Sequence, residues 1–291
     1  MKIFITGSTG FIGKHLTKAL SNHQLTLFTR KQYGDLNTAK LNLKDQDIII
    51  HIAGLLVGNK QEYINSNINA TKKLFENIKN PKQVIQFSTA GVLGPIINNI
   101  PNESSKYNPT NLYEKSKTIA EKIVLSYKDK FPVTIIRPEF IYGPEDMHVL
   151  QLFKSIKQRK FAYIGKGNNT LYPCYIDDLI AAVKLTINNK ATFGKIFNVG
   201  GPRLVKMKEF ISTAAKILKV PSPKLHVPKI AAQLAEPFIP MITKTRIQFF
   251  TENRGCKINK IMELGYRPKV DIEEGISKTI NWYKEKNLLW K

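Results

Sequence analysis

The sequence predicts an α/β protein in which a doubly wound parallel sheet carries helices on both faces, with a smaller region at the C-terminal end. Three observations predict this class. Short runs of Ile, Val and Phe alternate with helical patterns over the first half of the chain. These runs are apolar at nearly every position, as strands buried on both faces are. A glycine-rich turn joins the first run to the first helix, which is how a nucleotide-binding βα unit begins.

The expected elements follow one another in a regular order. Strands are expected at KIFIT, LTLFT, DIIIHIA, VIQFS and VTIIRP, that is at residues 2–6, 25–29, 47–53, 84–88 and 133–138. Between them, amphipathic patterns predict helices from about residue 11, over 62–78 and over 113–127. Residues 32–46 leave room only for one short strand, YGDLN, and a turn of helix.

Beyond Tyr142 the alternation loosens. Helices are expected over 149–158, 178–187 and 208–218, and a strand at KIFNVG, residues 195–200. We therefore expect a dinucleotide-binding domain of the Rossmann type over residues 1–165, with its sheet completed by residues 172–200. Residues 201–291 would form a substrate-binding region and lid.

The lid is expected in the segment 220–240, which prolines interrupt. The overlapping apolar segment 230–250 is expected to form a wall of the substrate site. The alternative is a surface helix that touches membrane lipid.

Composition narrows the range of partners. The chain has 291 residues, 42% of them hydrophobic, which suffices for a sizeable core. The net charge of +23 comes mostly from lysines spread along the whole chain, whereas a nucleic-acid footprint is a clustered patch. We therefore expect a small-molecule substrate, with neither nucleic acid nor a membrane as the main partner.

Two further absences bear on metal sites and location. Cys174 and Cys256 are far apart and have no CxxC partner, so neither a disulfide framework nor a metal site is expected. The chain shows no signal peptide and no apolar run of roughly 18 residues, which predicts a cytoplasmic protein.

The glycine-rich turn is GSTGFIG, with Gly7, Gly10 and Gly13 directly after the first expected strand. Glycines let a pyrophosphate approach the backbone, and the free N–H groups at the start of the helix, at Phe11 and Ile12, attract it. A tight turn with no ligand is the alternative. The position of the turn after the first strand favours phosphate binding.

Tyr113 and Lys117 lie four residues apart in YEKSK and so share one face of the expected helix. An ordinary tyrosine has a pKa of about 10, so ionising it near neutral pH takes roughly 4 kcal/mol of help. A lysine ammonium one turn away, together with an oxidised nicotinamide, can supply that help. The alternative is a solvated helix face, but the position 24 residues after Thr89 favours a proton-transfer pair.

Several motifs together resemble the extended short-chain dehydrogenase/reductases. This family includes nucleotide-sugar epimerases and dehydratases, dihydroflavonol reductases and 3β-hydroxysteroid dehydrogenases. The resemblance covers nearly the whole chain, in TGSTGFIG (6–13), HIAG (51–54), NINAT (67–71), FSTAGVLG (87–94), YEKSK (113–117), RPEFIYGPED (137–146), YIDD (175–178), LGYRP (264–268) and EEG (273–275).

The resemblance implies a role for each catalytic candidate. Thr89, with Ser88 as the alternative, would hydrogen-bond the reacting oxygen. Tyr113 would exchange the hydroxyl proton, and Lys117 would hold the nicotinamide ribose and lower the tyrosine pKa. Asn67 would help to order the site, or else only satisfy backbone amides at a helix start.

The cofactor contacts implied by the resemblance lie at the ends of the first strands. Ala53, Gly54 and Ser88 would lie beside the cofactor, and Asp35 with Leu36 would lie on its shortened adenine side. Arg30 stands where NAD-selective sites carry an acidic residue. A guanidinium there favours the 2′-phosphate of NADP, so we expect NADP, with NAD as the alternative.

Three functions stay open. The leading one is an NAD(P)-dependent oxidoreductase that transfers hydride reversibly at a secondary carbinol or ketone, with Tyr113, Lys117 and Thr89 as its catalytic groups. The alternatives are a nucleotide-sugar epimerase or dehydratase, and a non-catalytic cofactor-binding accessory subunit.

Two apolar residues bear on the choice between a carbinol or ketone oxidoreductase and a nucleotide-sugar epimerase or dehydratase. Phe140 and Leu171 stand where sugar-nucleotide enzymes of the family often carry Asn and Arg, which favours a hydrophobic or weakly charged carbinol or ketone over a nucleotide sugar, although Arg203 or Arg254 could compensate. Glu139 has no second carboxylate beside it in sequence, so no acid–base pair is assigned to it. The helix around Tyr113 is a candidate surface for a homodimer.

Overall fold

The computed structural model describes residues 1–236, 238–239 and 243–289. At its centre lies one sheet of six parallel strands, and the predicted α/β class with a doubly wound sheet is confirmed. The order across the sheet is β10 (Lys195–Val199), β5 (Val133–Pro138), β4 (Gln83–Phe87), β3 (Ile48–His51), β1 (Lys2–Thr6) and β2 (Gln24–Phe28).

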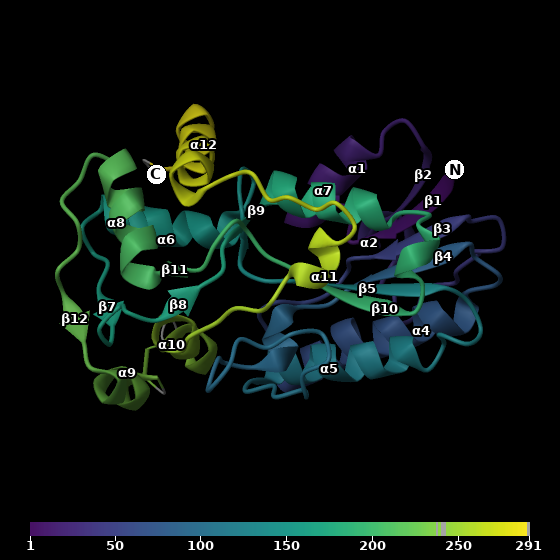
Figure 1. The fold of residues 1–291 in the computed structure, drawn as a ribbon, viewed down its shortest axis with the longest axis horizontal. Coiled ribbons are helices and arrows are strands. Elements are labelled where there is room, and N and C mark those ends of the chain that lie inside the picture. Colours follow the sequence, from purple (N-terminus) through teal and green to yellow (C-terminus); the bar gives the residue numbers. More distant parts are fainter. Residues whose placement is uncertain (237, 240–242, 290–291) are drawn as a thin grey trace.

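Helices cover both faces of this sheet (Figure 1). α1 (Phe11–Ala19) and α7 (Ile176–Thr186) lie together on one face, and α4 (Ala70–Asn77) and α5 (Leu112–Leu125) on the other. Successive residues of a strand point to opposite faces. Ile48 and Ile50 accordingly pack in one hydrophobic cluster and Ile49 in a second, and all three are fully buried.

The connection between β2 and β3 contains a turn of helix, as predicted, but no strand. It holds α2 (Arg30–Tyr33) and then turns, so the strand expected at residues 33–37 is wrong. Gly34 has a φ of 75°, and the Asp35 carboxylate accepts the N–H of Asn37 at 3.2 Å. An αL glycine followed by an Asx turn bends the chain away from an extended path.

The helix predicted over 62–78 is divided into three parts, α3 (Lys60–Tyr63), the π-helix η1 (Ile64–Asn69) and α4. A π-helical turn inside a helix often marks a functional position. Two short 3₁₀ turns, η2 (Ala90–Leu93) and η3 (Lys190–Thr192), follow β4 and α7.

The remaining elements gather at one end of the molecule, left of the sheet in Figure 1. The helices there are α6 (Met147–Lys157), α8 (Met207–Ile217), α9 (Lys229–Ala235), α10 (Lys244–Thr251) and α12 (Ile272–Glu285). Short strand pairs join them, namely β7 (Tyr163–Ile164) with β12 (His226–Val227), and β8 (Thr170–Leu171) with β11 (Val205–Lys206). Between this end and the sheet lie α11 (Asn259–Met262) and the pair β6 (Ile141–Tyr142) and β9 (Cys174–Tyr175).

The predicted division at residue 165 stays a prediction. β10 pairs with β5, so a segment near residue 200 does complete the sheet. α6, however, precedes residue 165 and packs against α8, with the rings of Phe153 and Phe210 6.4 Å apart. The chain therefore passes into the second group of helices and returns to the sheet.

The predicted lid falls partly on residues 237 and 240–242, which lie outside the described residues. Within the described part, α9 exposes Ile230 and Leu234, whereas α10 buries Ile247. The apolar wall and the lid stay predictions. Among the described residues no helix has the length and apolar character needed to cross a membrane, and no group of His, Cys, Asp and Glu could hold a metal ion.

Candidate active site

The glycine turn leaves no room for side chains at two of its three glycines. A Cβ on Gly7 would lie 2.6 Å from the Ala53 nitrogen, and one on Gly13 would lie 2.0 Å from the Gly7 carbonyl oxygen. Gly10 is the N-cap of α1 and offers no side-chain cap. The first N–H groups of α1, at Phe11 and Ile12, are therefore available to an anion, where the helix dipole adds a positive potential.

α5 presents the predicted proton-transfer residues beside the end of β4. Asn111 caps this helix by accepting the N–H of Glu114 at 3.0 Å. One turn inside the helix, the buried Lys117 donates from Nζ to the Phe87 carbonyl at 2.7 Å. Thr89 follows β4 and caps η2 by accepting the N–H of Gly91 at 3.1 Å. The fold thus brings Thr89, Tyr113 and Lys117 together.

Burial shifts the pKa values of Tyr113 and Lys117 in opposite directions. It raises the pKa of the Tyr113 phenol above its ordinary value, and the hydrogen bond with Thr89 opposes the rise. It lowers the pKa of Lys117 to about 8, against the attraction of Glu121. Tyr113 therefore holds its proton at neutral pH, as a proton donor to a carbonyl must. The predicted lowering of the tyrosine pKa by Lys117 stays a prediction.

Asn67 holds a loop against α5. Its side chain accepts the Leu55 N–H at 2.6 Å and donates to the Leu55 carbonyl at 3.1 Å and to the Ser116 hydroxyl at 2.9 Å. The side chain is 1% exposed. In this structure Asn67 orders the loop that follows β3, and the amides it satisfies are not those of a helix start.

The loop after β3 lies close to these residues. A Cβ on Gly54 would be 3.2 Å from Asn67 Oδ1 and 3.6 Å from Lys117 Nζ. Ala53 donates its N–H to the Thr6 hydroxyl at 3.3 Å. The buried Ser88 hydroxyl has no hydrogen-bond partner among the described residues, so it can accept one from a ligand.

The adenine-side candidates differ in their accessibility. Arg30 is exposed and lies 3.9 Å from the Asp35 carboxylate, so a positive and a negative group stand side by side. Leu36 is 4% exposed and packs in the cluster with Phe4 and Phe28. Its side chain is therefore taken up by the core, and only its backbone can meet a cofactor.

Sequence reasoning missed a charged network beside Tyr113. Arg254 is buried and donates to Glu114 at 2.9 Å, to Glu252 at 2.6 Å and to the Thr110 hydroxyl at 3.0 Å. It therefore links the start of α5 to the segment after α10. Residues 140 positions apart in sequence form this pair, so no local pattern could have predicted it.

A second buried pair fixes α5 to the sheet. Arg137 of β5 contacts Glu121 of α5 through three hydrogen bonds of 2.7–3.2 Å, and Tyr107 donates to the same carboxylate at 3.0 Å. Arg137 and Glu121 are essentially inaccessible to solvent. This pair holds the helix that carries Tyr113 and Lys117.

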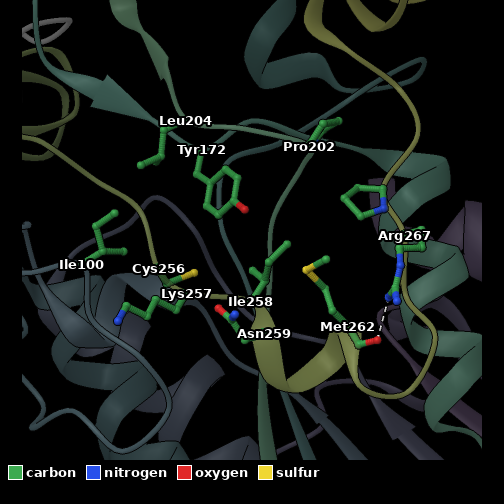
Figure 2. Close-up of a pocket in the computed structure, with 11 residues that line it drawn as sticks. Ile100, Tyr172, Pro202, Leu204, Cys256, Lys257, Ile258, Asn259, Met262 and Arg267 are labelled. Atoms are coloured by element: carbon green, nitrogen blue, oxygen red, sulfur yellow. Dashed lines mark hydrogen bonds between the residues drawn. The ribbon is translucent and has the colours of Figure 1, made fainter.

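A hollow lined by residues of the C-terminal half lies apart from these groups (Figure 2). Its volume is about 450 Å³, similar to that of a second hollow of about 490 Å³ beside Tyr127 and Phe131, and Arg267 in its lining donates to the Met262 carbonyl at 2.7 Å. None of the predicted site residues lines it; its walls are Ile100, Tyr172, Pro202, Leu204, Cys256, Lys257, Ile258, Asn259, Met262, Arg267 and Pro268. We therefore place the chemistry at Tyr113, where the polar groups converge.

Comparison with known proteins identifies the family of the chain. Residues 3–200 match the model of the NAD dependent epimerase/dehydratase family. A dTDP-D-glucose 4,6-dehydratase of Dictyostelium discoideum is 29% identical over 99% of this chain and 83% of its own length. UDP-glucuronate 4-epimerase 1 of Arabidopsis thaliana is 26% identical over 97% of this chain and 76% of its own.

A solved structure shares the architecture. The UDP-glucuronic acid 4-epimerase of Bacillus cereus, in complex with NAD, superposes with a TM-score of 0.82 at 23% identity, over 98% of this chain and 99% of that one. The likeness in architecture therefore extends over almost the whole of both chains.

Proposed function

The chain belongs to the NAD-dependent epimerase/dehydratase family, as its resemblance to the extended short-chain dehydrogenase/reductases predicted, and we propose that it converts a nucleotide-linked sugar by transient hydride transfer. One observation supports this most: Thr89, Tyr113 and Lys117 converge at the end of β4, beside a glycine turn that fits a dinucleotide. The relatives with named activities include nucleotide-sugar dehydratases and epimerases.

The residues present fit a nicotinamide dinucleotide. The collisions that any Cβ would make at Gly7 and Gly13 define a cradle for its diphosphate, and the free amides of Phe11 and Ile12 would bind it. When bound, this cofactor takes up the hydride of the carbinol carbon. Ala53, Gly54 and Ser88 would contact its nicotinamide side, while Arg30 and Asp35 would lie towards its adenosine ribose.

The proton transfer falls to the side chains of the chain itself. Burial by itself keeps the proton on Tyr113, but with an oxidised nicotinamide and the Lys117 ammonium beside it, its phenolate would accept the proton of the sugar hydroxyl as the carbon is oxidised and return it in the reverse step. Thr89 hydrogen-bonds the same oxygen and keeps it in line with the phenol. Lys117, with its pKa lowered to about 8, supplies a positive charge that offsets the cost of the phenolate.

The argument for a hydrophobic carbinol weakens in the structure. Phe140 packs against Phe249 and Phe210, with ring centroids 5.1 and 5.5 Å apart, so its aromatic character serves packing. Leu171 is 1% exposed. Both residues on which the preference for a hydrophobic substrate rested are explained by the core, and the relatives favour the nucleotide-sugar alternative.

The proposed preference for NADP rests on Arg30. Its exposed guanidinium could pair with a 2′-phosphate, but Asp35 beside it could equally accept the ribose hydroxyl of NAD. The solved relative binds NAD. We therefore propose a nicotinamide dinucleotide as the cofactor, either NAD or NADP, and do not require the 2′-phosphate of NADP.

The proposal is tested with a panel of UDP-, dTDP- and GDP-sugars. The purified protein, loaded with NAD or NADP, is expected to show transient absorbance of reduced nicotinamide with at least one sugar and to yield an altered sugar by NMR. Tyr113→Phe is expected to abolish both signals, and Tyr127→Phe, in the turn that follows α5, to keep them. If no sugar reduces the cofactor, the protein instead fits the cofactor-binding accessory subunit.

A further inference from the structure

α9 and the turn that follows it expose large apolar side chains. Ile230 and Leu234, one helical turn apart, are 71% and 70% exposed, and Phe238 in the following turn is 84% exposed. Ala232, on the opposite face of α9, is 1% exposed. The helix therefore turns its largest apolar side chains to water and a small one to the protein, and adjacent exposed apolar side chains mark an interaction surface. We call Ile230, Leu234, Phe238 and Ile239 the α9 patch.

The α9 patch has a defined place in the fold. It lies at the lower left in Figure 1, at the end of the molecule away from the six-stranded sheet. The N–H groups of Phe238 and Ile239 donate to the Ala235 carbonyl at 3.1 and 2.9 Å, so both residues are held at the end of the helix. α9 itself contacts α10, and the preceding strand β12 pairs with β7.

This end of the molecule is almost without negative charge. Of the 45 Lys and Arg and the 22 Asp and Glu of the chain, the residues 147–176 and 210–251 hold 11 basic residues but one acidic residue, Glu236. The carboxylate of Glu236 accepts the Lys244 N–H at 2.7 Å. Lys and Arg are about as frequent here as in the rest of the chain, so the local excess of positive charge comes from missing acids. A search for clustered lysines does not detect it.

Lysines border the α9 patch. Lys229 is the first residue of α9, and Lys244 is the first residue of α10. Lys166 follows β7, where the Gly165 N–H donates to the Val227 carbonyl at 2.8 Å. These three lysines are exposed, and none of them forms an ion pair within the ranges 1–236, 238–239 and 243–289. The surface thus has an apolar centre and a border of positive charges that are available to a partner.

An anionic lipid surface matches this combination. A helix of this kind lies in the membrane interface, with its apolar side chains at the acyl boundary and its lysines among the headgroups. A second copy of the chain fits poorly, because a two-fold interface would bring the same lysines face to face. A nucleic acid would attract the lysines but would place Ile230 and Leu234 against a charged backbone.

We propose that the α9 patch docks the protein on membranes that contain anionic phospholipids. Ile230, Leu234 and Phe238 enter the interface, and the bordering lysines contact the headgroups. This is the second of the two roles that the sequence left open for the apolar segment 230–250, and it adds a membrane contact to a protein with a small-molecule substrate. Gln248 of α10 accepts a hydrogen bond from Asn111 at 3.3 Å, so α10 joins the docked end to the helix that carries Tyr113.

The test is flotation of the full chain with lipid vesicles. We expect binding to vesicles of equal parts phosphatidylcholine and phosphatidylglycerol, weakening as salt is added, and little binding to phosphatidylcholine alone. Leu234→Ser combined with Phe238→Ser should weaken the binding by at least about tenfold, because less apolar surface is buried. Lys229→Gln combined with Lys244→Gln should weaken it by about tenfold. All four side chains are exposed, so these variants should fold.

Matched variants elsewhere serve as controls. Val57→Ser changes an apolar side chain that is 69% exposed in the loop after β3, and Lys18→Gln combined with Lys79→Gln removes two exposed charges on and next to the helices of the sheet. Both should leave vesicle binding nearly unchanged. Phe238→Trp reports insertion directly: its fluorescence should shift to the blue with the mixed vesicles, whereas that of Val57→Trp should not.

Four outcomes would overturn the proposal. The first is no binding to the mixed vesicles, or binding that the patch variants leave unchanged. The second is binding without a blue shift in Phe238→Trp, which indicates adsorption by charge alone. The third is a dimer in ultracentrifugation that Leu234→Ser with Phe238→Ser converts to a monomer, because a second copy then covers the patch. The fourth is an RNA oligonucleotide that displaces the protein from the vesicles. Since no sugar or cofactor enters this test, its result is independent of the proposed function.

Discussion

Replacing Arg137 by methionine is expected to destabilise the protein strongly, because it leaves the Glu121 carboxylate buried with only Tyr107 as a side-chain partner. In the native pair Arg137 is 1% exposed and Glu121 0%, and three hydrogen bonds of 2.7–3.2 Å join them. Removing one partner of such a pair costs about 3–5 kcal/mol. For a chain of this size we expect the melting temperature to fall by roughly 10 °C.

The measurement is urea unfolding near neutral pH, followed by circular dichroism, with two further variants. Lys216→Met removes an exposed pair, in which Lys216 lies 2.8 Å from Glu273, and should leave the urea midpoint nearly unchanged because water screens such a pair. Glu121→Leu combined with Arg137→Met removes both buried charges and should recover most of the lost stability. If Arg137→Met costs no more than Lys216→Met, the buried pair does not hold α5 against the sheet.

Four further outcomes are expected. Tyr113→Phe should lower turnover by at least about 10²-fold with the cofactor dissociation constant nearly unchanged; turnover within a few-fold of wild type would refute its role. Lys117→Ala should weaken cofactor binding and turnover together, and a change in only one of them contradicts the dual role. Arg30→Ala should weaken NADP binding by about tenfold more than NAD binding, and tighter binding of NAD to the wild type speaks against the preference. The pKa of Glu139 rises from 4.5 to about 7 on folding, so the folded state binds the extra proton and stability should fall as the pH rises through that window. Glu139→Gln should remove that fall in stability, and an unchanged pH profile contradicts the shift.

The fold followed from the sequence where burial alone decides the pattern. Runs such as IIIH in β3 are apolar because both faces of the sheet are covered, and helices of the predicted length separate them. The prediction failed at residues 33–37, where β-prone Tyr33 and Leu36 suggested a strand. Gly34 in the αL region and the Asx turn at Asp35 decided the backbone there, and Leu36 packs in the core without a strand partner.

The site was predictable only in part. Some of its residues are neighbours in sequence, whereas others meet only after the chain has folded. Tyr113 and Lys117 are four residues apart on one helix, so a local pattern reveals them. Arg254 reaches Glu114 across 140 residues, and nothing near either residue in sequence indicates the pair. That pair still shapes the site, because it ties the start of α5, next to Tyr113, to the segment after α10.

Glu139 itself carried a signal that sequence reasoning did not use. It was set aside because no second carboxylate stands beside it in sequence, but the structure places it near the charges of Glu114 and Arg254, and burial raises its pKa to about 7. The alternation of Val133, Ile135 and Arg137 toward α5 already placed Glu139 on the face of that helix, once β5 was recognised as a strand. In a parallel sheet, the alternation of side chains along a strand therefore predicts which helix the residue after that strand faces. This is a better guide to its surroundings than its neighbours in sequence.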